Sequence, residues 1–163
     1  MVMGSELATV LRLEVDGIDF SDEERISAIE ERMPEASFVL QNGVVMAEVD
    51  LGAAAGRQYE QAIRVIRRLK DQCALEIKRV EPLPVDIADI ARLVGVERRE
   101  AKKWSENAQV SLTWSVGGGE NPQKPWNLYS VNEWLSEEKK IKLGLELPSP
   151  QLVQEIDAYL AGL

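Results

Sequence analysis

Four basic side chains lie close together near the middle of the chain, at positions 98, 99, 102 and 103. At this spacing a helix presents Arg98, Arg99, Lys102 and Lys103 on one face. Ammonium and guanidinium groups bind phosphate oxygens, and the planar guanidinium also matches the O6 and N7 acceptors of guanine. Such side chains are rarely buried, so we expect the cluster to face solvent or a polyanion. DNA is the polyanion that the neighbouring residues favour.

Residues 87–104 predict two short helices separated by Gly95. Apolar residues recur at i, i+3, i+4 and i+7 in the first helix, at Ile87, Ile90, Ala91 and Val94. Gly95 permits a positive φ at little cost, which suits a sharp turn after a helix end. The second helix would pack back through Val96, Ala101 and Trp104, leaving its basic face exposed. This pattern predicts a helix-turn-helix motif.

The residues that follow predict a hairpin and two more helices. Residues 110–114 and 125–129 are strand-like runs that flank a loop, 115–124, containing glycines and Pro122. Ser130 with Glu133 has the spacing of a capping box and predicts a helix start. Ser149 and Pro150 predict the start of a last helix, whose apolar stripe is Leu152, Ile156, Tyr159 and Leu160.

The first half of the chain predicts a separate α+β domain. Residues 9–16 and 74–80 alternate between apolar and polar, as half-buried strands do. Ser21 with Glu24 predicts the start of a helix that Pro34 ends, and a second amphipathic helix covers residues 53–72. Asn42-Gly43, between the strand-like runs 37–41 and 44–51, favours a type I′ hairpin. The resulting order, β-α-β-β-α-β, predicts a ferredoxin-like domain.

The predicted fold class is therefore α+β, divided into three parts. Residues 1–82 form the ferredoxin-like domain, with a role in assembly or sensing, and the prolines near residue 82 form a linker. Residues 83–144 form a winged helix-turn-helix domain, and residues 145–163 form a C-terminal helix. The open face of the sheet, or the C-terminal helix, could hold a second copy of the chain as a homodimer.

The order of helix, glycine turn, basic helix, glycine-rich hairpin and Ser-Val-x-x-Trp-Leu resembles the winged helix-turn-helix of the MerR and phage excisionase superfamily. Ala91, Gly95 and Ala101 match the small, glycine and apolar positions of that motif. The chain is similar to bacterial, largely actinobacterial, proteins that carry a small α+β domain before such a motif. Members often have Phe-Pro after the recognition helix, where this chain has residues 110–114.

The resemblance implies sequence-specific binding of double-stranded DNA, and it assigns roles to seven residues. Arg98 and Arg99 would read base edges in the major groove, and Lys102 and Lys103 would hold phosphates. Ser105 and Asn107 would lie near the DNA backbone, and Lys124 would be the contact of the wing. We expect either a transcription regulator or a recombination accessory factor.

Composition narrows the function classes. The 163 residues include no histidine and one cysteine, Cys73, so the commonest general base and multi-cysteine metal sites are absent. No catalytic constellation is recognisable, and we expect a protein that is not an enzyme and has no cofactor or metal. No apolar run approaches the ~20 residues that span a bilayer, and the start lacks a signal-peptide pattern, so we expect a cytoplasmic location away from membranes.

The net charge of −9 leaves a second hypothesis open. Residues 1–80 carry 10 basic and 15 acidic side chains, whereas residues 85–144 carry nine of each. Residues 97–103 hold four basic and two acidic side chains, so the basic cluster could simply be a solvated helix face. In that case the helix-turn-helix would be a scaffold, and the acidic surface would bind a basic partner in an antitoxin-like or phage-defence-related interaction module.

The other conspicuous residues have structural interpretations. Trp104, Trp126 and Trp134 are expected in the core, whereas Trp114 could be core or an exposed contact. Cys73 is expected to be a small buried hydrophobic residue. The arginines at positions 57, 64, 67 and 68 are expected to form an ordinary solvated face of the second helix, although a second nucleic-acid surface is the alternative.

Overall fold

A computed structural model describes residues 9–52, 55–116 and 121–163. The chain divides into two compact units, one made of Met1–Glu81 with Leu152–Leu163 and the other of Pro82–Gln151. The second unit is thus inserted in the sequence between the last strand of the first unit and its C-terminal helix. The last helix, predicted as a separate segment 145–163, groups with the first unit.

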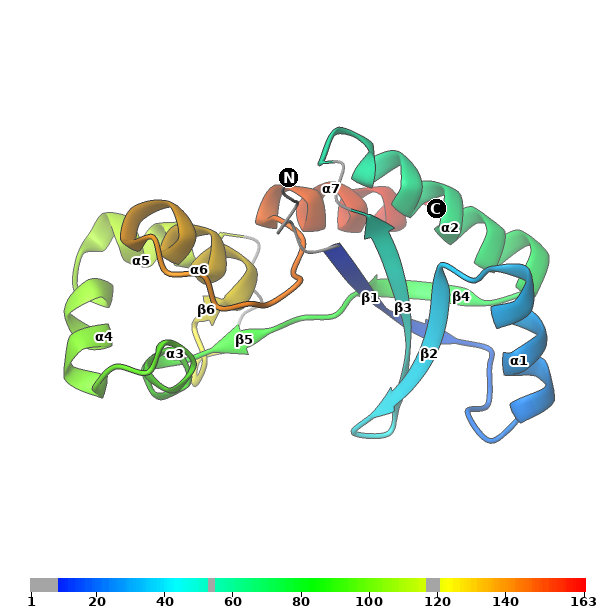
Figure 1. Cartoon of the computed structure of the whole chain (residues 1–163), viewed down its shortest axis with the longest axis horizontal. Coiled ribbons are helices and arrows are strands. Elements are labelled where there is room, and N and C mark those ends of the chain that lie inside the picture. The colour runs from blue at the N-terminus through cyan, green and yellow to red at the C-terminus, as the bar shows by residue number, and fades with distance from the viewer. Residues whose placement is uncertain (1–8, 53–54, 117–120) are drawn as a thin grey trace, which may run out of the picture. The chain divides into compact units, whose positions relative to one another are not determined.

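The first unit is a four-stranded sheet with helices (Figure 1). Its elements are β1 (Thr9–Asp16), α1 (Glu23–Arg32), β2 (Ala36–Gln41), β3 (Val44–Gly52), a 3-10 turn (Ala55–Arg57), α2 (Gln58–Cys73), β4 (Glu76–Val80) and α7 (Pro150–Ala161). The strand order is β2-β3-β1-β4, and every neighbouring pair is antiparallel. The predicted succession of strands and helices is therefore observed, within the α+β class.

Local sequence accounts for the boundaries of several elements. Asn42 and Gly43 have φ values of 53° and 79°, the two positive values that a type I′ turn needs, and Gln41 pairs with Val44 across it. The predicted cap at Ser21 is wrong by one residue: Asp22 caps α1, and its side chain accepts from the backbone N of Arg25. The hydroxyl of Ser21 instead donates to Asp19 Oδ1 at 2.7 Å.

Alternation along the strands gives the sheet two chemically different faces. Leu11, Leu13 and Val15 of β1 are buried, as are the inward residues of α2: Ala62, Val65, Ile66 and Leu69. The alternate positions of β1 carry charges that pair with neighbouring strands. Arg12 Nε lies 2.8 Å from Glu48 Oε2, and Arg79 Nε lies 3.1 Å from Glu14 Oε2. One face therefore holds the core, and the other holds cross-strand ion pairs.

Both edge strands have a backbone N–H that a helix side chain satisfies. On β2, the N–H of Phe38 donates to Glu30 Oε2 of α1 at 3.1 Å. On β4, the N–H of Val80 donates to Asp157 Oδ1 of α7 at 3.0 Å. The buried side chains of α7, Leu152, Val153, Ile156 and Leu160, fix this helix in the first unit. These contacts protect edge groups that would otherwise be free to pair with another chain.

The second unit is mainly helical. Its elements are β5 (Pro84–Val85), α3 (Ile87–Val94), α4 (Arg98–Ser105), α5 (Ala108–Trp114), β6 (Trp126–Asn127), α6 (Leu128–Trp134) and a π-helical turn (Leu135–Lys139). The two short strands pair antiparallel, with Val85 opposite Trp126. Its core contains Val85, Ile90, Ala91, Ala101, Trp114, Val131 and Leu135.

The predicted hairpin is wrong. Residues 110–114 lie in helix α5, and β6 pairs with β5 instead of with them. Asn107 explains the helix, because its side chain accepts from the backbone N of Gln109 and of Val110 and so caps α5. Val110 and Trp114 are then four residues apart on one helical face, and Trp114 is fully buried. The glycines of the predicted hairpin loop, residues 117–119, lie outside the described residues.

The predicted helix start at Ser130 is also wrong. Helix α6 begins at Leu128, and the side chain of Asn127 accepts from the backbone N of Tyr129 at 2.8 Å. Ser130 Oγ donates instead to the carbonyl of Val116 at 2.8 Å, and so links α6 to the end of α5. A serine inside the first turn can satisfy its hydroxyl through a tertiary contact, which the capping-box pattern does not anticipate.

Candidate nucleic-acid interface

Helix α3 is closed at both ends by its own sequence. Asp86 Oδ1 accepts from the backbone N of Asp89 at 2.9 Å, and Asp89 Oδ2 accepts from the backbone N of Asp86 at 3.0 Å, which completes a capping box. Gly95 follows the last turn with φ 83°, and its N–H donates to the carbonyl of Ala91. The predicted turn at Gly95 is therefore present, and it determines where α4 begins.

Helix α4 packs through Ala101 and Trp104 and exposes its charges. Ala101 is fully buried in the core that contains Ile90 and Ala91 of α3. The side chains of Arg98, Arg99, Lys102 and Lys103 are all exposed. Among the ion pairs within residues 9–52, 55–116 and 121–163, none involves these four residues. Their positive charge is thus available to an anion.

Three of the four basic residues meet in one groove. Its volume is about 580 Å³, and it is lined by Ile87, Arg98, Arg99, Lys102, Ser105, Glu106 and Trp126. Lys103 does not line it. Ile87 and Trp126 were not expected here, because their contribution depends on the β5–β6 pairing, which brings Trp126 beside Val85 at the entrance to α3. Because Ile87 and Trp126 are apolar, the sequence predicted that they would be buried and did not predict that they would line a groove.

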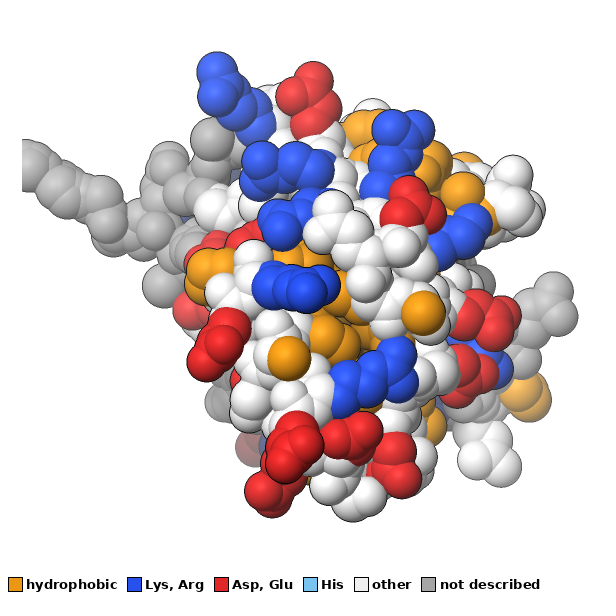
Figure 2. Space-filling model, turned by 90° about the vertical axis from the view of Figure 1, so that its right-hand side faces the viewer, with side chains coloured by type: hydrophobic (Ala, Val, Ile, Leu, Met, Phe, Trp, Pro, Cys, Tyr) orange, Lys and Arg blue, Asp and Glu red, His pale blue; other side chains and the backbone are white. Residues whose placement is uncertain are grey.

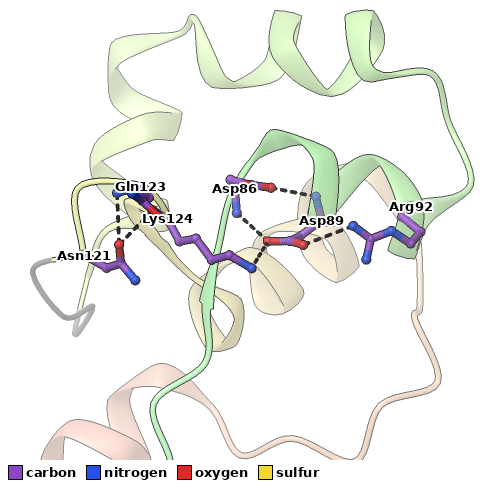
Figure 3. Close-up of polar contacts among 6 residues, drawn as sticks. All are labelled: Asp86, Asp89, Arg92, Asn121, Gln123 and Lys124. Atoms are coloured by element: carbon purple, nitrogen blue, oxygen red, sulfur yellow. Dashed lines mark hydrogen bonds and ion pairs between the residues drawn. The ribbon is translucent and has the colours of Figure 1, made fainter.

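The other predicted site residues are placed differently. Ser105 lines the groove, and its hydroxyl donates to the carbonyl of Lys102 at 2.8 Å. Asn107 is occupied as the cap of α5 and faces a different hollow. Lys124 does not line the groove: its Nζ lies 3.1 Å from Asp89 Oδ2, as Figure 3 shows. The structure therefore brings Arg98, Arg99, Lys102 and Ser105 together and leaves Lys103, Asn107 and Lys124 apart from them.

The Lys124 contact fastens the segment before β6 to the start of α3. Asn121 Oδ1 accepts from the backbone N of Gln123 and of Lys124, which orients the lysine (Figure 3). Burial acts to raise the pKa of Asp89, but hydrogen bonds from the Asp86 backbone and from Lys124 outweigh it and lower that pKa. Arg92 also contacts Asp89, at 3.2 Å.

The four tryptophans form one connected cluster that supports the helices. Trp114 lies 5.4 Å from Trp126 and 5.3 Å from Trp134 between ring centroids, and Trp134 lies 5.8 Å from Trp104. Trp104, Trp126 and Trp134, predicted in the core, are half-buried and pack against it instead. Trp114, left open by the sequence, is fully buried, and its Nε1 has no hydrogen-bond partner among the described residues. This cluster holds α4, α5 and α6 together.

A second hollow in the same unit is acidic. Its volume is about 380 Å³, and it is lined by Asn107, Gln109, Val110, Thr113, Glu133, Trp134, Glu137 and Glu138. Burial, with the neighbouring charge of Glu137, raises the pKa of Glu133. Sequence reasoning missed this hollow. In the sequence, the hollow was indicated only by the i, i+4 spacing of Glu133 and Glu137. Two carboxylates at that spacing in a helix repel each other unless a cation lies near them.

The arginines of α2 are partly engaged in contacts within the first unit. Figure 2 shows Lys and Arg side chains gathered over part of the face on which α1 and α2 lie in Figure 1, with Asp and Glu side chains along another part. Arg67 Nε donates to the hydroxyl of Tyr159, Arg68 pairs with Glu35, and Arg64 donates to Gln61. These arginines therefore have contacts with neighbouring side chains of the first unit, as is common for an exposed helix face.

Comparison with known proteins assigns this chain to no family. No protein-family model, curated protein or solved structure matches the chain. Among the described residues, no group of three or more His, Cys, Asp or Glu side chains is arranged to hold a metal ion, and Cys73 is buried as a free thiol. In the same part of the chain, no helix has the length and apolar character needed to cross a bilayer.

Proposed function

We propose that the second unit binds double-stranded DNA in a sequence-specific manner through α4. The observation that carries this proposal is the groove in which Arg98, Arg99 and Lys102 meet without an ion-pair partner among the described residues. Arg98 and Arg99 begin the helix, where side chains of a recognition helix reach base edges. Lys102 and Lys103 would hold phosphates.

Only part of the likeness to the MerR and excisionase motif supports this proposal. Helix α3, Gly95 and α4 support a helix-turn-helix, whereas α5 takes the place of the first strand of the expected wing. The predicted roles of Ser105, Asn107 and Lys124 at the DNA backbone remain predictions. For Lys124 such a role would compete with its ion pair to Asp89.

The first unit would then have a role in assembly of the protein or in sensing. We propose that it is a ferredoxin-like domain, and the strand order β2-β3-β1-β4 and the positions of α1 and α2 in the chain support this proposal. A single small DNA-reading module buries roughly 600–1,000 Å², whereas specific sites commonly use more, so a homodimer on a repeated site fits the proposal. A transcription regulator and a recombination accessory factor both use such an arrangement.

Selection from a random duplex pool tests the proposal. The full chain is incubated with the pool at near-physiological salt, and the bound fraction is sequenced over several rounds. We expect an enriched sequence with wild type and none with Arg98→Glu/Arg99→Glu. The matched control is Arg64→Glu/Lys70→Glu, which changes the net charge equally on exposed positions of α2 and should retain the enrichment. Enrichment that survives in the α4 variant would overturn the proposal.

The acidic hollow favours a second candidate function. Glu133, Glu137 and Glu138 lie beside the apolar side chain of Val110, a combination suited to a Lys or Arg side chain of a partner protein. The ring of Trp134 already has Lys139 Nζ 5.8 Å from its centroid. Under this candidate the helices are a scaffold, in an antitoxin-like or phage-defence-related interaction module. Glu133→Gln/Glu137→Gln should then abolish partner binding, while Arg98→Glu/Arg99→Glu leaves it intact. This candidate would be excluded if Arg98→Glu/Arg99→Glu abolished partner binding and Glu133→Gln/Glu137→Gln left it intact.

A further inference from the structure

The lining of the groove beside α4 combines two kinds of surface. Arg98, Arg99 and Lys102 supply positive charge, and Ile87 and Trp126 supply apolar surface, the apolar wall. The indole N–H of Trp126 already donates to Ser111 Oγ at 3.2 Å, so the tryptophan offers carbon surface only. A phosphate group alone would leave the apolar wall unused.

The apolar wall is held rigidly. Ile87 is the first residue of α3, directly after the capping box of Asp86. Trp126 is held by its pairing with Val85 and by an edge-on contact with the buried ring of Trp114, 5.4 Å between centroids. Both side chains are half-buried, so each has surface left for a ligand. A preformed apolar surface beside cations selects an occupant that carries hydrogen-bond acceptors or negative charge together with an apolar group.

The major-groove edge of DNA offers that combination. Guanine presents two acceptors, O6 and N7, which a guanidinium can bind together, and thymine presents a 5-methyl group that apolar side chains contact. Resting on the proposed function, we infer that this groove reads a thymine next to a guanine. Arg98 or Arg99 binds the guanine, and Ile87 and Trp126 enclose the thymine methyl.

Removing a single methyl group from the DNA tests the inference. In the enriched duplex, each thymine is replaced in turn by deoxyuridine, which lacks only the 5-methyl, and binding of the full chain is titrated. With wild type we expect one position to lose about fourfold in affinity, the effect of one buried methyl group. Ile87→Ala should abolish that sensitivity, and Ile87→Val and Trp126→Phe should weaken it. Leu93→Ala, an exposed leucine of α3 that does not line the groove, should retain it.

The outcomes separate the inference from the proposed function. If no duplex is enriched, the proposed function fails and the inference fails with it. If a sequence is enriched but contains no thymine beside guanine, or shows no methyl-sensitive position, the inference alone is overturned. Sensitivity that persists in a folded Ile87→Ala variant, or that is undiminished in Ile87→Val, would also overturn it, because the methyl would then contact another surface. Tryptophan fluorescence establishes folding of each variant.

Discussion

Lys124 and Asp89 join two segments of the second unit that are 35 positions apart in the sequence, with 3.1 Å between Lys124 Nζ and Asp89 Oδ2. Asp89 also completes the capping box of α3, so one carboxylate serves a helix start and a tertiary ion pair. The lysine that the resemblance assigns to a DNA-contacting wing is thus held against the protein. Its first role in the structure is to position the segment that leads into β6.

We expect Lys124→Met to destabilise the second unit by ~0.5–1 kcal/mol at pH 7, as for other partly exposed ion pairs. The folded-state pKa of Asp89 is lowered from 3.8, so its stabilisation is fully present above that pH and is lost as the pH falls below it. The difference from wild type should therefore narrow in acid. Urea unfolding, followed by tryptophan fluorescence, measures it, because all four tryptophans lie in the second unit.

Lys142→Met is the matched control for that experiment. Lys142 is an exposed lysine of the same unit, and no ion pair of the described residues involves it. Its stability should stay close to wild type at every pH. A Lys124→Met effect that is unchanged between neutral pH and pH 3 would contradict the role given to the ion pair.

Gly95→Ala should cost about 1 kcal/mol through backbone strain alone. Gly95 has φ 83°, and a Cβ placed there would have no atom within 4 Å, so no steric clash adds to the cost. Gly95→Asn should be less destabilising than alanine, because asparagine tolerates the left-handed region better. Urea unfolding of the three proteins measures this order. Equal stability of the alanine variant and wild type would mean that the turn has relaxed.

Asp157→Asn should stabilise the first unit at pH 7, by on the order of 0.5 kcal/mol. Burial raises the pKa of Asp157, although the N–H of Val80 acts against this, so its ionisation disfavours the folded state. The stability associated with this carboxyl is present below its unfolded pKa and is lost as the pH rises through its folded pKa. The asparagine variant should lack this dependence, which far-UV circular dichroism during urea unfolding can follow from pH 3 to pH 7.

Asp157→Ala is the contrasting variant. It removes the acceptor at Val80 as well as the charge, and leaves the N–H of an edge strand without its partner. We expect a loss of ~1 kcal/mol or more relative to the asparagine variant. If alanine and asparagine are equally stable, the hydrogen bond from Val80 contributes nothing and α7 is held by its apolar side chains alone.

Under the proposed function, substitutions inside the groove and outside it should have different kinds of effect on DNA binding. Arg98→Ala should cost ~1–3 kcal/mol on the enriched sequence and relax selectivity at one base pair. Lys103→Ala, outside the groove, should weaken binding to all sequences and lower the salt slope by about 1. Lys124→Ala should change the slope less, because Asp89 already compensates its charge. Titrations of specific and scrambled duplexes at several salt concentrations test these outcomes.

Short-range patterns in the sequence anticipated much of this molecule. The alternation of β1, the Asn42-Gly43 hairpin and the turn at Gly95 each follow from the conformational preferences of a few adjacent residues. Exposure of the basic residues of α4 follows from the cost of burying charge. Such features depend on neighbours in the sequence, so they can be predicted without knowledge of the fold.

Tertiary packing decided the rest. Residues 110–114 alternate between apolar and hydroxyl-bearing side chains, which favours a strand, but the burial of Trp114 together with the cap at Asn107 makes them a helix. Trp126 becomes a groove wall only because β6 pairs with β5, which lies about 40 residues earlier. Lys124 likewise meets Asp89 only after the chain has folded back on itself. The sequence alone thus determined the helices, turns and charges that local preference controls, whereas contacts between distant segments, set by how side chains pack in three dimensions, determined the shape and apolar wall of the groove.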